Sequence, residues 1–226
     1  MSKIGILLNE LELYWLYLTG VTMIWVGITG PMGGGKSSVA RILRSRGFTV
    51  IDADQVVHEL MAPGTIVSDS IVKTFGTSIK NADGSIDRKA LGRAVFGAPE
   101  KLTQLEQILH PQVRARVAEL KLKCQGQQLP AAFYDVPLLF EKNMVSQFDY
   151  VLVVSAWPEL RMQRLKQRTG LTEPEIQARW QNQLPAEYKE SHADALIWNN
   201  GSWQDLESSV DQALARLGIS PTVTEA

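Results

Sequence analysis

The chain has 226 residues, of which 45% are hydrophobic, and 23 lysines and arginines nearly balance 24 aspartates and glutamates for a formal net charge of -1. This composition is that of an ordinary globular protein, and it excludes disorder along the whole chain as well as fibrous or solenoid repeats. Because the net charge is close to zero, we expect no nucleic-acid partner, and any phosphate binding must come from local groups. The single cysteine, Cys124, cannot form an internal disulfide, which favours a reducing, cytoplasmic location.

The beginning of the chain is apolar from residue 4 to residue 28, which is long enough to raise the question of a membrane span. Glu10 and Glu12 interrupt this run, no small-residue cleavage site follows it, and its last part is needed as a strand by the motif described below. We therefore expect neither a membrane anchor nor a signal peptide. Residues 1–22 are interpreted either as an accessory helix or as a stretch translated upstream of a natural start at Met23.

From Met23 onward, short apolar runs alternate with amphipathic stretches, a pattern typical of an α/β protein with a parallel sheet covered by helices. Five strands are predicted, at residues 24–29, 48–51, 131–136, 150–154 and 195–198. Helices are predicted at residues 36–47, 55–61, 67–75, 88–95, 100–109, 112–123, 158–168, 174–183 and 203–217. Pro111, with His110 before it, is expected to mark the boundary between two of these helices.

An unusually long stretch of sequence separates the second predicted strand from the third, and this stretch carries several helical patterns. An insertion of this kind usually forms a substrate-binding lobe. We therefore predict a nucleotide-binding core, a helical domain and a lid, with a frayed tail at the end. The core comprises residues 23–54, 126–156 and 184–219, the helical domain residues 55–125, the lid residues 157–183 and the tail residues 220–226.

The segment GPMGGGKS, from Gly30 to Ser37, fits the phosphate-binding pattern G-x-x-x-x-G-K-[ST]. Glycines allow successive backbone N–H groups to point at one anion, and the start of the following helix adds partial positive charge. We expect Lys36 to lie between the β- and γ-phosphates of ATP and the Ser37 hydroxyl to ligate Mg²⁺. The predicted nucleotide-binding residues are Gly30, Gly33, Gly34, Gly35, Lys36, Ser37 and Ser38.

A phosphate-binding loop alone does not separate kinases from GTPases, motor ATPases or signalling switches. Guanine specificity normally comes with an Asn-Lys-x-Asp run. The nearest candidate, Asn199-Asn200-Gly201, lacks both the lysine and the aspartate, so the GTPase interpretation is disfavoured.

Carboxylates follow the second and third predicted strands, at the sheet edge where ligands of open α/β proteins bind. Asp54 is the candidate catalytic residue, because a carboxylate there can orient an acceptor hydroxyl and accept its proton. The alternative for Asp54 is that it caps the next helix. Asp52 either takes that cap or orients Mg²⁺-bound water, and Asp135 either supports the metal from its outer sphere or forms a turn.

The predicted helix at residues 158–168 carries Arg161, Arg164 and Arg168 at i, i+3 and i+7, which places the three side chains on one face. Guanidinium groups can stabilise charge on the oxygens of a phosphoryl group in transfer. We assign catalytic roles to Arg164 and Arg168. The alternative is a solvated basic helix face.

With these residues, the chain resembles the dephospho-CoA kinases, relatives of the nucleoside monophosphate kinases, from about Met23 to Leu217. Beyond the loop, the resemblance rests on residues 27–30 (GITG), 50–54 (VIDAD), 109–111 (LHP) with Val113, 136–141 (VPLLFE), 164–168, Gln183, 193–194 (AD) and 199–201 (NNG). It implies a five-stranded parallel core, a helical domain that holds the CoA substrate, and an arginine-bearing lid. It also implies transfer of the ATP γ-phosphoryl group to the 3′-hydroxyl of dephospho-CoA in the last step of coenzyme A biosynthesis, with Asp54 matching the proposed base.

The chain departs from the usual family loop, T-G-G-I-G-S-G-K-S, at Pro31 and Gly34, which replace the second glycine and the serine. Pro31 fixes φ and removes one N–H, while Gly34 is expected only to loosen the loop. Residues 1–22 have no family counterpart. Two alternatives remain: a kinase for another small metabolite or nucleotide, and a non-catalytic nucleotide-binding switch whose helical lobe docks a protein. No feature of the sequence points to a particular oligomeric state.

Overall fold

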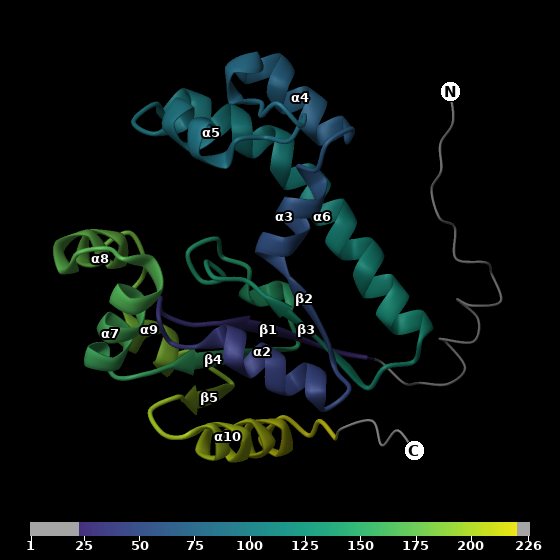
Figure 1. Cartoon of the computed structure of the whole chain (residues 1–226). Helices are drawn as coiled ribbons and strands as arrows, with labels where there is room; N and C mark the ends of the chain where they lie inside the picture. Colours follow the sequence, from purple (N-terminus) through teal and green to yellow (C-terminus); the bar gives the residue numbers. More distant parts are fainter. Residues whose placement is uncertain (1–22, 221–226) are drawn as a thin grey trace. The chain divides into compact units, whose positions relative to one another are not determined.

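The computed structural model describes residues 23–220 (Figure 1). The interpretation of residues 1–22 and nearly all of the predicted tail lie outside the described residues. By its contacts the chain divides into a core unit, residues 23–50 and 123–220 of the described range, and a helical unit, residues 51–122.

The predicted fold class is confirmed: the sheet has five parallel strands in the order β2-β3-β1-β4-β5. The strands are β1 (Ile24–Thr29), β2 (Thr49–Asp52), β3 (Ala131–Asp135), β4 (Tyr150–Ser155) and β5 (Ala195–Trp198). The chain adds strands first on one side of β1 and then on the other, so β1 is the topological switch point. Ligands of open α/β sheets bind beyond the carboxyl end of the strands at this point. The segment that follows Thr29 therefore occupies the position expected of a binding site.

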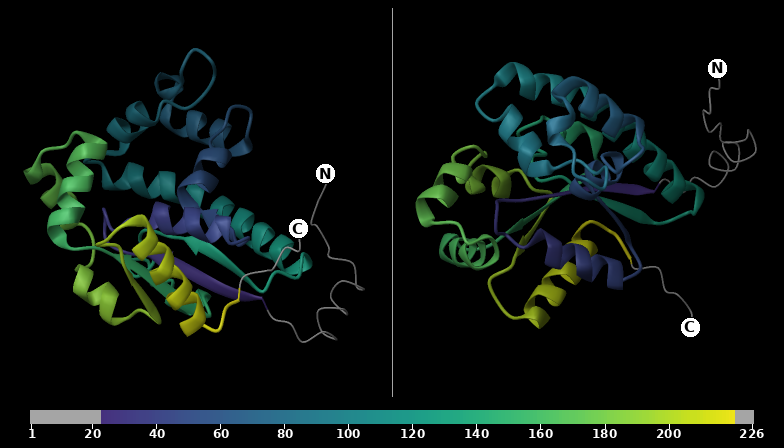
Figure 2. Two further views of the ribbon diagram at one scale, coloured as in Figure 1. Left: turned by 60° about the horizontal axis from the view of Figure 1, so that its bottom comes forward. Right: turned by 45° about the horizontal axis from the view of Figure 1, so that its top comes forward.

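Two amphipathic helices cover one face of the sheet, α2 (Lys36–Ser45) and α10 (Trp203–Arg216), as Figures 1 and 2 show. Val39, Leu43 and Val210 are fully buried and belong to one apolar cluster with residues of the strands. These side chains recur at helical spacing, so the sequence itself directs the apolar face of each helix to the sheet. Their packing holds the start of α2 next to the end of β1.

The helices that follow β4 are α7 (Pro158–Thr169), α8 (Glu173–Trp180) and α9 (Ala186–Ser191). Gly170, with φ +69°, ends α7 in the left-handed conformation, and Thr172 begins α8 with a capping box to Glu175. α7 and α8 contact each other, while α9 contacts β4.

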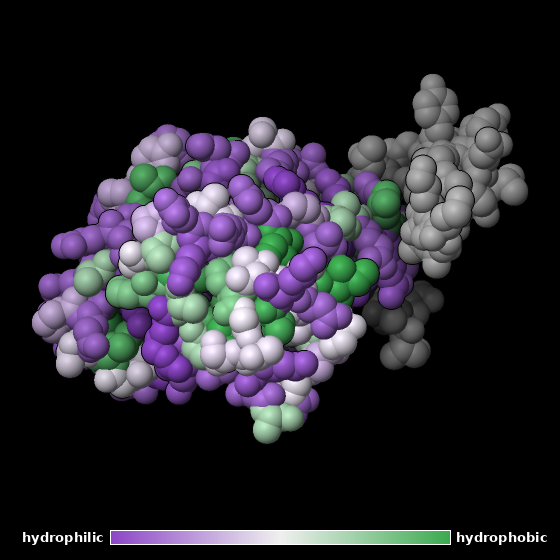
Figure 3. Space-filling view, turned by 90° about the horizontal axis from the view of Figure 1, so that it is seen from above, coloured by the Kyte–Doolittle hydropathy of each residue, from purple (hydrophilic) through white to green (hydrophobic). Residues whose placement is uncertain are grey.

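The helical unit contains α3 (Ala53–Leu60), α4 (Ile66–Phe75), α5 (Arg88–Val95) and most of α6 (Pro99–Gly126). Its own apolar core is formed by Met61, Val67, Ile71, Ile79, Ile86 and Leu91. Figure 3 shows apolar residues scattered among hydrophilic ones on the face it presents. Within residues 23–220, no helix combines the length and the apolar character needed to cross a bilayer.

The predicted helix boundary at Pro111 is wrong, because α6 continues through this residue from Pro99 to Gly126. Proline lacks the N–H that would bond to the carbonyl of Gln107, a loss of roughly 3 kcal/mol in a helix interior. Leu105 and Ile108, just before it, pack against the core of the helical unit. We attribute the continuity of α6 to this packing, which outweighs the local preference of His110 for an extended conformation.

Candidate active site

The loop between β1 and α2 has a backbone that requires glycine. Gly30, Gly33 and Gly35 have φ values of +149°, +84° and +99°, a region that other residues rarely adopt. Gly35 is the N-cap of α2, and no side chain caps this helix. The start of α2 therefore offers backbone N–H groups and a partial positive charge to an anion.

The loop is also crowded against its neighbours. A Cβ atom on Gly30 or on Gly34 would overlap the carbonyl oxygen of Val154 in β4, and one on Gly33 would lie 2.9 Å from the carbonyl oxygen of Arg161. The expectation that Gly34 merely loosens the loop is therefore wrong, since its small size permits a close approach to β4. Pro31, despite its missing N–H, accepts a hydrogen bond of 3.0 Å from the N–H of Gly34 and closes a turn.

Three predicted nucleotide-binding residues form the first turn of α2. Lys36 is half-buried, Ser37 is exposed, and the N–H of Ser38 donates to the carbonyl of Gly35 at 3.0 Å. Asp135 ends β3 and pairs in register with Ile28 of β1, so its carboxylate lies at the same sheet edge as the loop.

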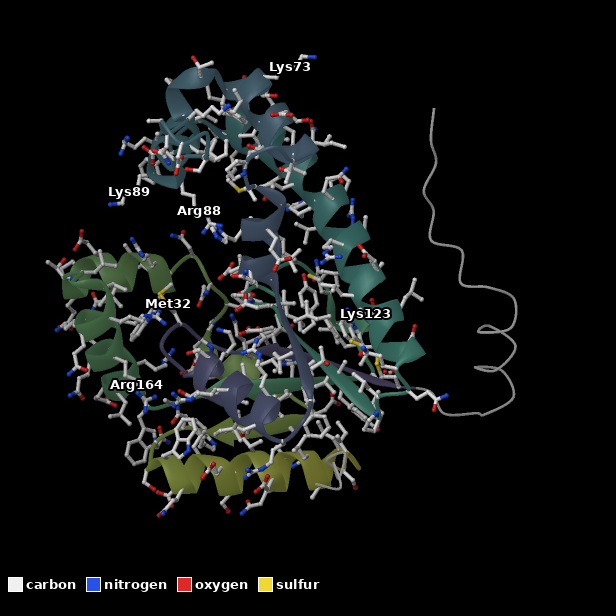
Figure 4. The ribbon with its side chains drawn as sticks, turned by 45° about the vertical axis from the view of Figure 1, so that its right-hand side comes forward. Met32, Lys73, Arg88, Lys89, Lys123 and Arg164 are labelled. Atoms are coloured by element: carbon white, nitrogen blue, oxygen red, sulfur yellow. The ribbon has the colours of Figure 1, made fainter. Side chains whose placement is uncertain are left out.

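Two side-chain amides hold the loop from outside the motif. The N–H of Met32 donates to Oε1 of Gln183 at 3.3 Å, and Nδ2 of Asn199 donates to the carbonyl of Gly34 at 3.1 Å. Figure 4 labels Met32 in this loop and Arg164 on α7. Sequence reasoning assigned no role to either amide in the site. The signal was the position of Asn199, at the carboxyl end of a predicted strand of the same sheet.

The carboxylates of Asp52 and Asp54, at the end of β2 and the start of α3, make different contacts. Oδ1 of Asp52 accepts hydrogen bonds from the N–H groups of Asp54, at 2.8 Å, and Gln55, at 3.1 Å, and so caps α3. Asp54 lies in the first turn of α3 with an exposed side chain that makes no hydrogen bond or ion pair within residues 23–220. The cap therefore belongs to Asp52, which leaves the Asp54 carboxylate available for other contacts.

The three arginines of α7 differ in depth. Arg161 is only 7% exposed and its guanidinium carbon lies 4.7 Å from the ring centroid of Trp180. Arg164 is half-buried and donates from Nη2 to the carbonyl of Asn199 at 2.9 Å, whereas Arg168 is exposed. Burial lowers the pKa of Arg161, while the neighbouring Glu190 raises it.

A buried ion pair fastens the segment after β3. Lys189 of α9 is fully buried, and its Nζ lies 2.6 Å from Oε1 of Glu141, which also accepts a hydrogen bond of 3.0 Å from the N–H of Leu184. The ion pair joins the end of the VPLLFE segment to α9, and the bond from Leu184 joins it to the chain just after α8. The sequence around Lys189 contains no motif that predicts this ion pair.

The strand order, the glycine-rich loop at the switch point and the lysine and serine that begin α2 define a P-loop nucleotide-binding fold. Comparison with known proteins narrows this class to one family. A model of the dephospho-CoA kinase family matches residues 24–205. The dephospho-CoA kinase of Bdellovibrio bacteriovorus is 40% identical over 192 residues, which cover 85% of this chain and 95% of that protein. The chain belongs to the dephospho-CoA kinase family.

Solved structures agree with this membership. A Thermus thermophilus protein has a TM-score of 0.74 and 36% identity, covering 86% of this chain and 98% of its own. The dephospho-CoA kinase of Campylobacter jejuni has a TM-score of 0.65 and 28% identity, covering 85% of this chain and 96% of its own.

Proposed function

We propose that this protein transfers the γ-phosphoryl group of ATP to the 3′-hydroxyl of dephospho-CoA, forming coenzyme A and ADP. In this reaction the bond from the γ-phosphorus to the bridging oxygen of ADP breaks, a bond to the 3′-oxygen forms, and the hydroxyl proton leaves. The observation that carries the proposal is the uncapped start of α2 behind a glycine-rich loop at the sheet's switch point, in a chain of this family.

The residues around the loop fit a triphosphate. Nη1 of Arg164 and Nε of Arg161 are buried and have no hydrogen-bond partner within the described residues, and buried donors of this kind usually have one, so we infer that a bound phosphate supplies a partner on this side of the loop. We assign Lys36, Arg164 and the more exposed Arg168 to stabilising charge on the phosphoryl oxygens, the main contribution a protein makes to this reaction. Residues 157–183, which carry these arginines, would then act as a lid.

Mg²⁺ fits the same site through the exposed hydroxyl of Ser37, with Asp135 as a candidate outer-sphere partner at the neighbouring strand end. Mg²⁺ prefers a few oxygen ligands together with substrate phosphates, which matches a site with one protein hydroxyl. When bound, the ion neutralises charge between the β- and γ-phosphates.

For the acceptor side, we propose that Asp54 orients the 3′-hydroxyl and accepts its proton late in the transfer, because a carboxylate is a weak base towards an alcohol. The supporting observation is that Asp52 alone caps α3.

We further propose that the helical domain, predicted as residues 55–125, binds the CoA substrate. A cytoplasmic location agrees with the buried thiol of Cys124, whose pKa is raised by burial.

The test is to incubate the protein with ATP, Mg²⁺ and a panel of acceptors that contains dephospho-CoA, nucleosides, nucleotides and sugars. We expect ADP release only with dephospho-CoA, in equal amount to the coenzyme A formed. Faster ADP release with another acceptor would point to a different metabolite kinase. ATP binding with no acceptor-dependent ADP release would point to a nucleotide-binding switch.

A further inference from the structure

Asn199, the residue after β5, contacts three elements of the core unit and is only 8% exposed. Its N–H donates to the carbonyl of Ser155 at 2.8 Å, which extends the ladder at the end of β4. Its carbonyl accepts from Nη2 of Arg164 at 2.9 Å, and its side-chain Nδ2 donates to the carbonyl of Gly34 at 3.1 Å. One residue thus reaches the sheet edge, an α7 arginine and the phosphate loop.

The bond to Gly34 determines how the next peptide group is oriented. In a planar trans peptide the C=O and the following N–H point in opposite directions. Because Asn199 holds the carbonyl of Gly34, the N–H of Gly35 is directed away from Asn199, and this N–H makes no hydrogen bond within residues 23–220. Such an N–H, just before Lys36, is a donor for a bound phosphate.

The amide of Asn199 also fills the space beside Gly35. A Cβ atom on Gly35 would overlap Nδ2 of Asn199, so the amide and the loop backbone are in close contact. The side chain therefore limits the conformations of the loop at the N-cap of α2 as well as supplying a donor. Removing it would leave a buried carbonyl unsatisfied and open space for the loop to move.

We propose that Asn199 is a positioning residue for phosphoryl transfer, which sets the orientation of the Gly34–Gly35 peptide and the place of the Arg164 guanidinium together. This inference rests on the proposed function for its chemistry, but its effect on ATP binding requires no acceptor. It predicts that the loop and Arg164 act as a coupled unit rather than as independent contacts.

The neighbouring residue provides a matched control. Asn200 carries the same amide on the same segment, but its Oδ1 accepts from the N–H of Trp157 at 2.8 Å and its side chain makes no hydrogen bond to the loop. We expect Asn199→Ala to weaken Mg·ATP binding about tenfold, measured by calorimetry, because a buried carbonyl loses its donor. Asn200→Ala should bind within about twofold of the wild type, an affinity change that falls well under one tenfold step.

Arg164→Ala, made in both backgrounds, tests the coupling. Asn199→Ala keeps the main-chain carbonyl that accepts from Arg164 and removes only the amide that ties this segment to Gly34. If that amide also fixes the place of the carbonyl, the loss of ATP affinity caused by Arg164→Ala is at least about threefold smaller beside Asn199→Ala than in the wild type. Equal losses in the two backgrounds would overturn the link between the loop and the arginine.

Thermal unfolding separates positioning from packing. A lower melting temperature with wild-type ATP affinity in Asn199→Ala would show that the residue only packs, which overturns the proposal. If Asn199→Ala does not fold, the same measurement is made on Asn199→Asp. This variant keeps the size of the side chain but presents an acceptor, instead of a donor, to the Gly34 carbonyl. Weaker ATP binding by Asn199→Asp supports the proposal, and unchanged ATP affinity overturns it. A wild type that binds ATP but leaves dephospho-CoA unmodified would reject the proposed function alone.

Discussion

Helix α2 of the core unit begins differently from three helices of the helical unit, and also from α10 of its own unit, which Ser202 caps. In the helical unit, α3, α4 and α5 begin with Asp52, Thr65 and Asp87, whose side chains accept hydrogen bonds from the first N–H groups. In the core unit, α2 begins with Gly35 and has no such cap. The first N–H groups of every helix have no carbonyl partner within the helix itself. Where the protein leaves them unsatisfied at a sheet's switch point, a ligand can take the place of the cap.

The largest expected effect comes from removing the charge at the uncapped helix. We expect Lys36→Ala to lower turnover about a thousandfold while the fold is retained, because the lysine acts on phosphate oxygens in the transition state. Steady-state kinetics with dephospho-CoA and circular dichroism would measure both. Near-wild-type turnover would mean that the start of α2 is not where ATP reacts.

A pair of aspartate variants contrasts a capping carboxylate with an exposed one. Asp54→Asn should lower turnover about a hundredfold and change ATP affinity little, since it affects only the acceptor side. Asp52→Asn is the control, because asparagine caps helices about as well as aspartate. If Asp54→Asn instead abolished ATP binding, Asp54 would belong to the metal site.

Glycine variants test whether the crowding of the loop matters. Gly30→Ala places a Cβ atom against the carbonyl of Val154, at a φ of +149°, so we expect ATP affinity to fall by at least about tenfold. Gly92→Ala, in α5, has no atom within 4 Å of the added Cβ and should raise the free energy of unfolding by about 0.5–1 kcal/mol. Calorimetry and denaturant unfolding give the two values. Equal ATP affinity in both variants would contradict the need for glycine in the loop.

The smallest effect concerns acid stability in the helical unit. The pKa of Asp87 lies below its ordinary value of 3.8, mainly because its carboxylate accepts a hydrogen bond from the N–H of Ala90. Its contribution to stability is therefore complete above pH 3.8 and is lost as the pH falls through the lower folded value. Asp87→Asn keeps a capping oxygen but does not titrate. Unfolding curves at descending pH should show a shallower decline for this variant, and an identical decline would contradict the capping argument.

The sequence was sufficient to predict the fold class and the position of the glycine-rich loop between β1 and α2, because both depend on local patterns. The run at residues 24–29, the glycines and Lys36 occupy consecutive positions, and the backbone conformation follows from residue type. The contact of Asn199 with Gly34 joins residues 165 positions apart, and no local pattern reports it.

Helical spacing alone does not predict how deeply a side chain is buried. It gives the direction of a side chain around a helix axis, so it grouped the three arginines of α7, but burial depends on what packs against them. Trp180 covers Arg161, whereas Arg168 extends into solvent. At Pro111 the opposite happened, since tertiary packing maintained a helix that local preference would end.

The enclosed ammonium of Lys189 makes this residue a reporter of motion. Trypsin and amine-acylating reagents react only with an accessible lysine. The ion pair with Glu141 keeps the Lys189 side chain inaccessible as long as α9 remains packed against β4. Cleavage after Lys189 therefore requires the local opening of α9, so its rate measures how often that opening occurs. A proteolysis time course with and without ATP would show whether the nucleotide slows it.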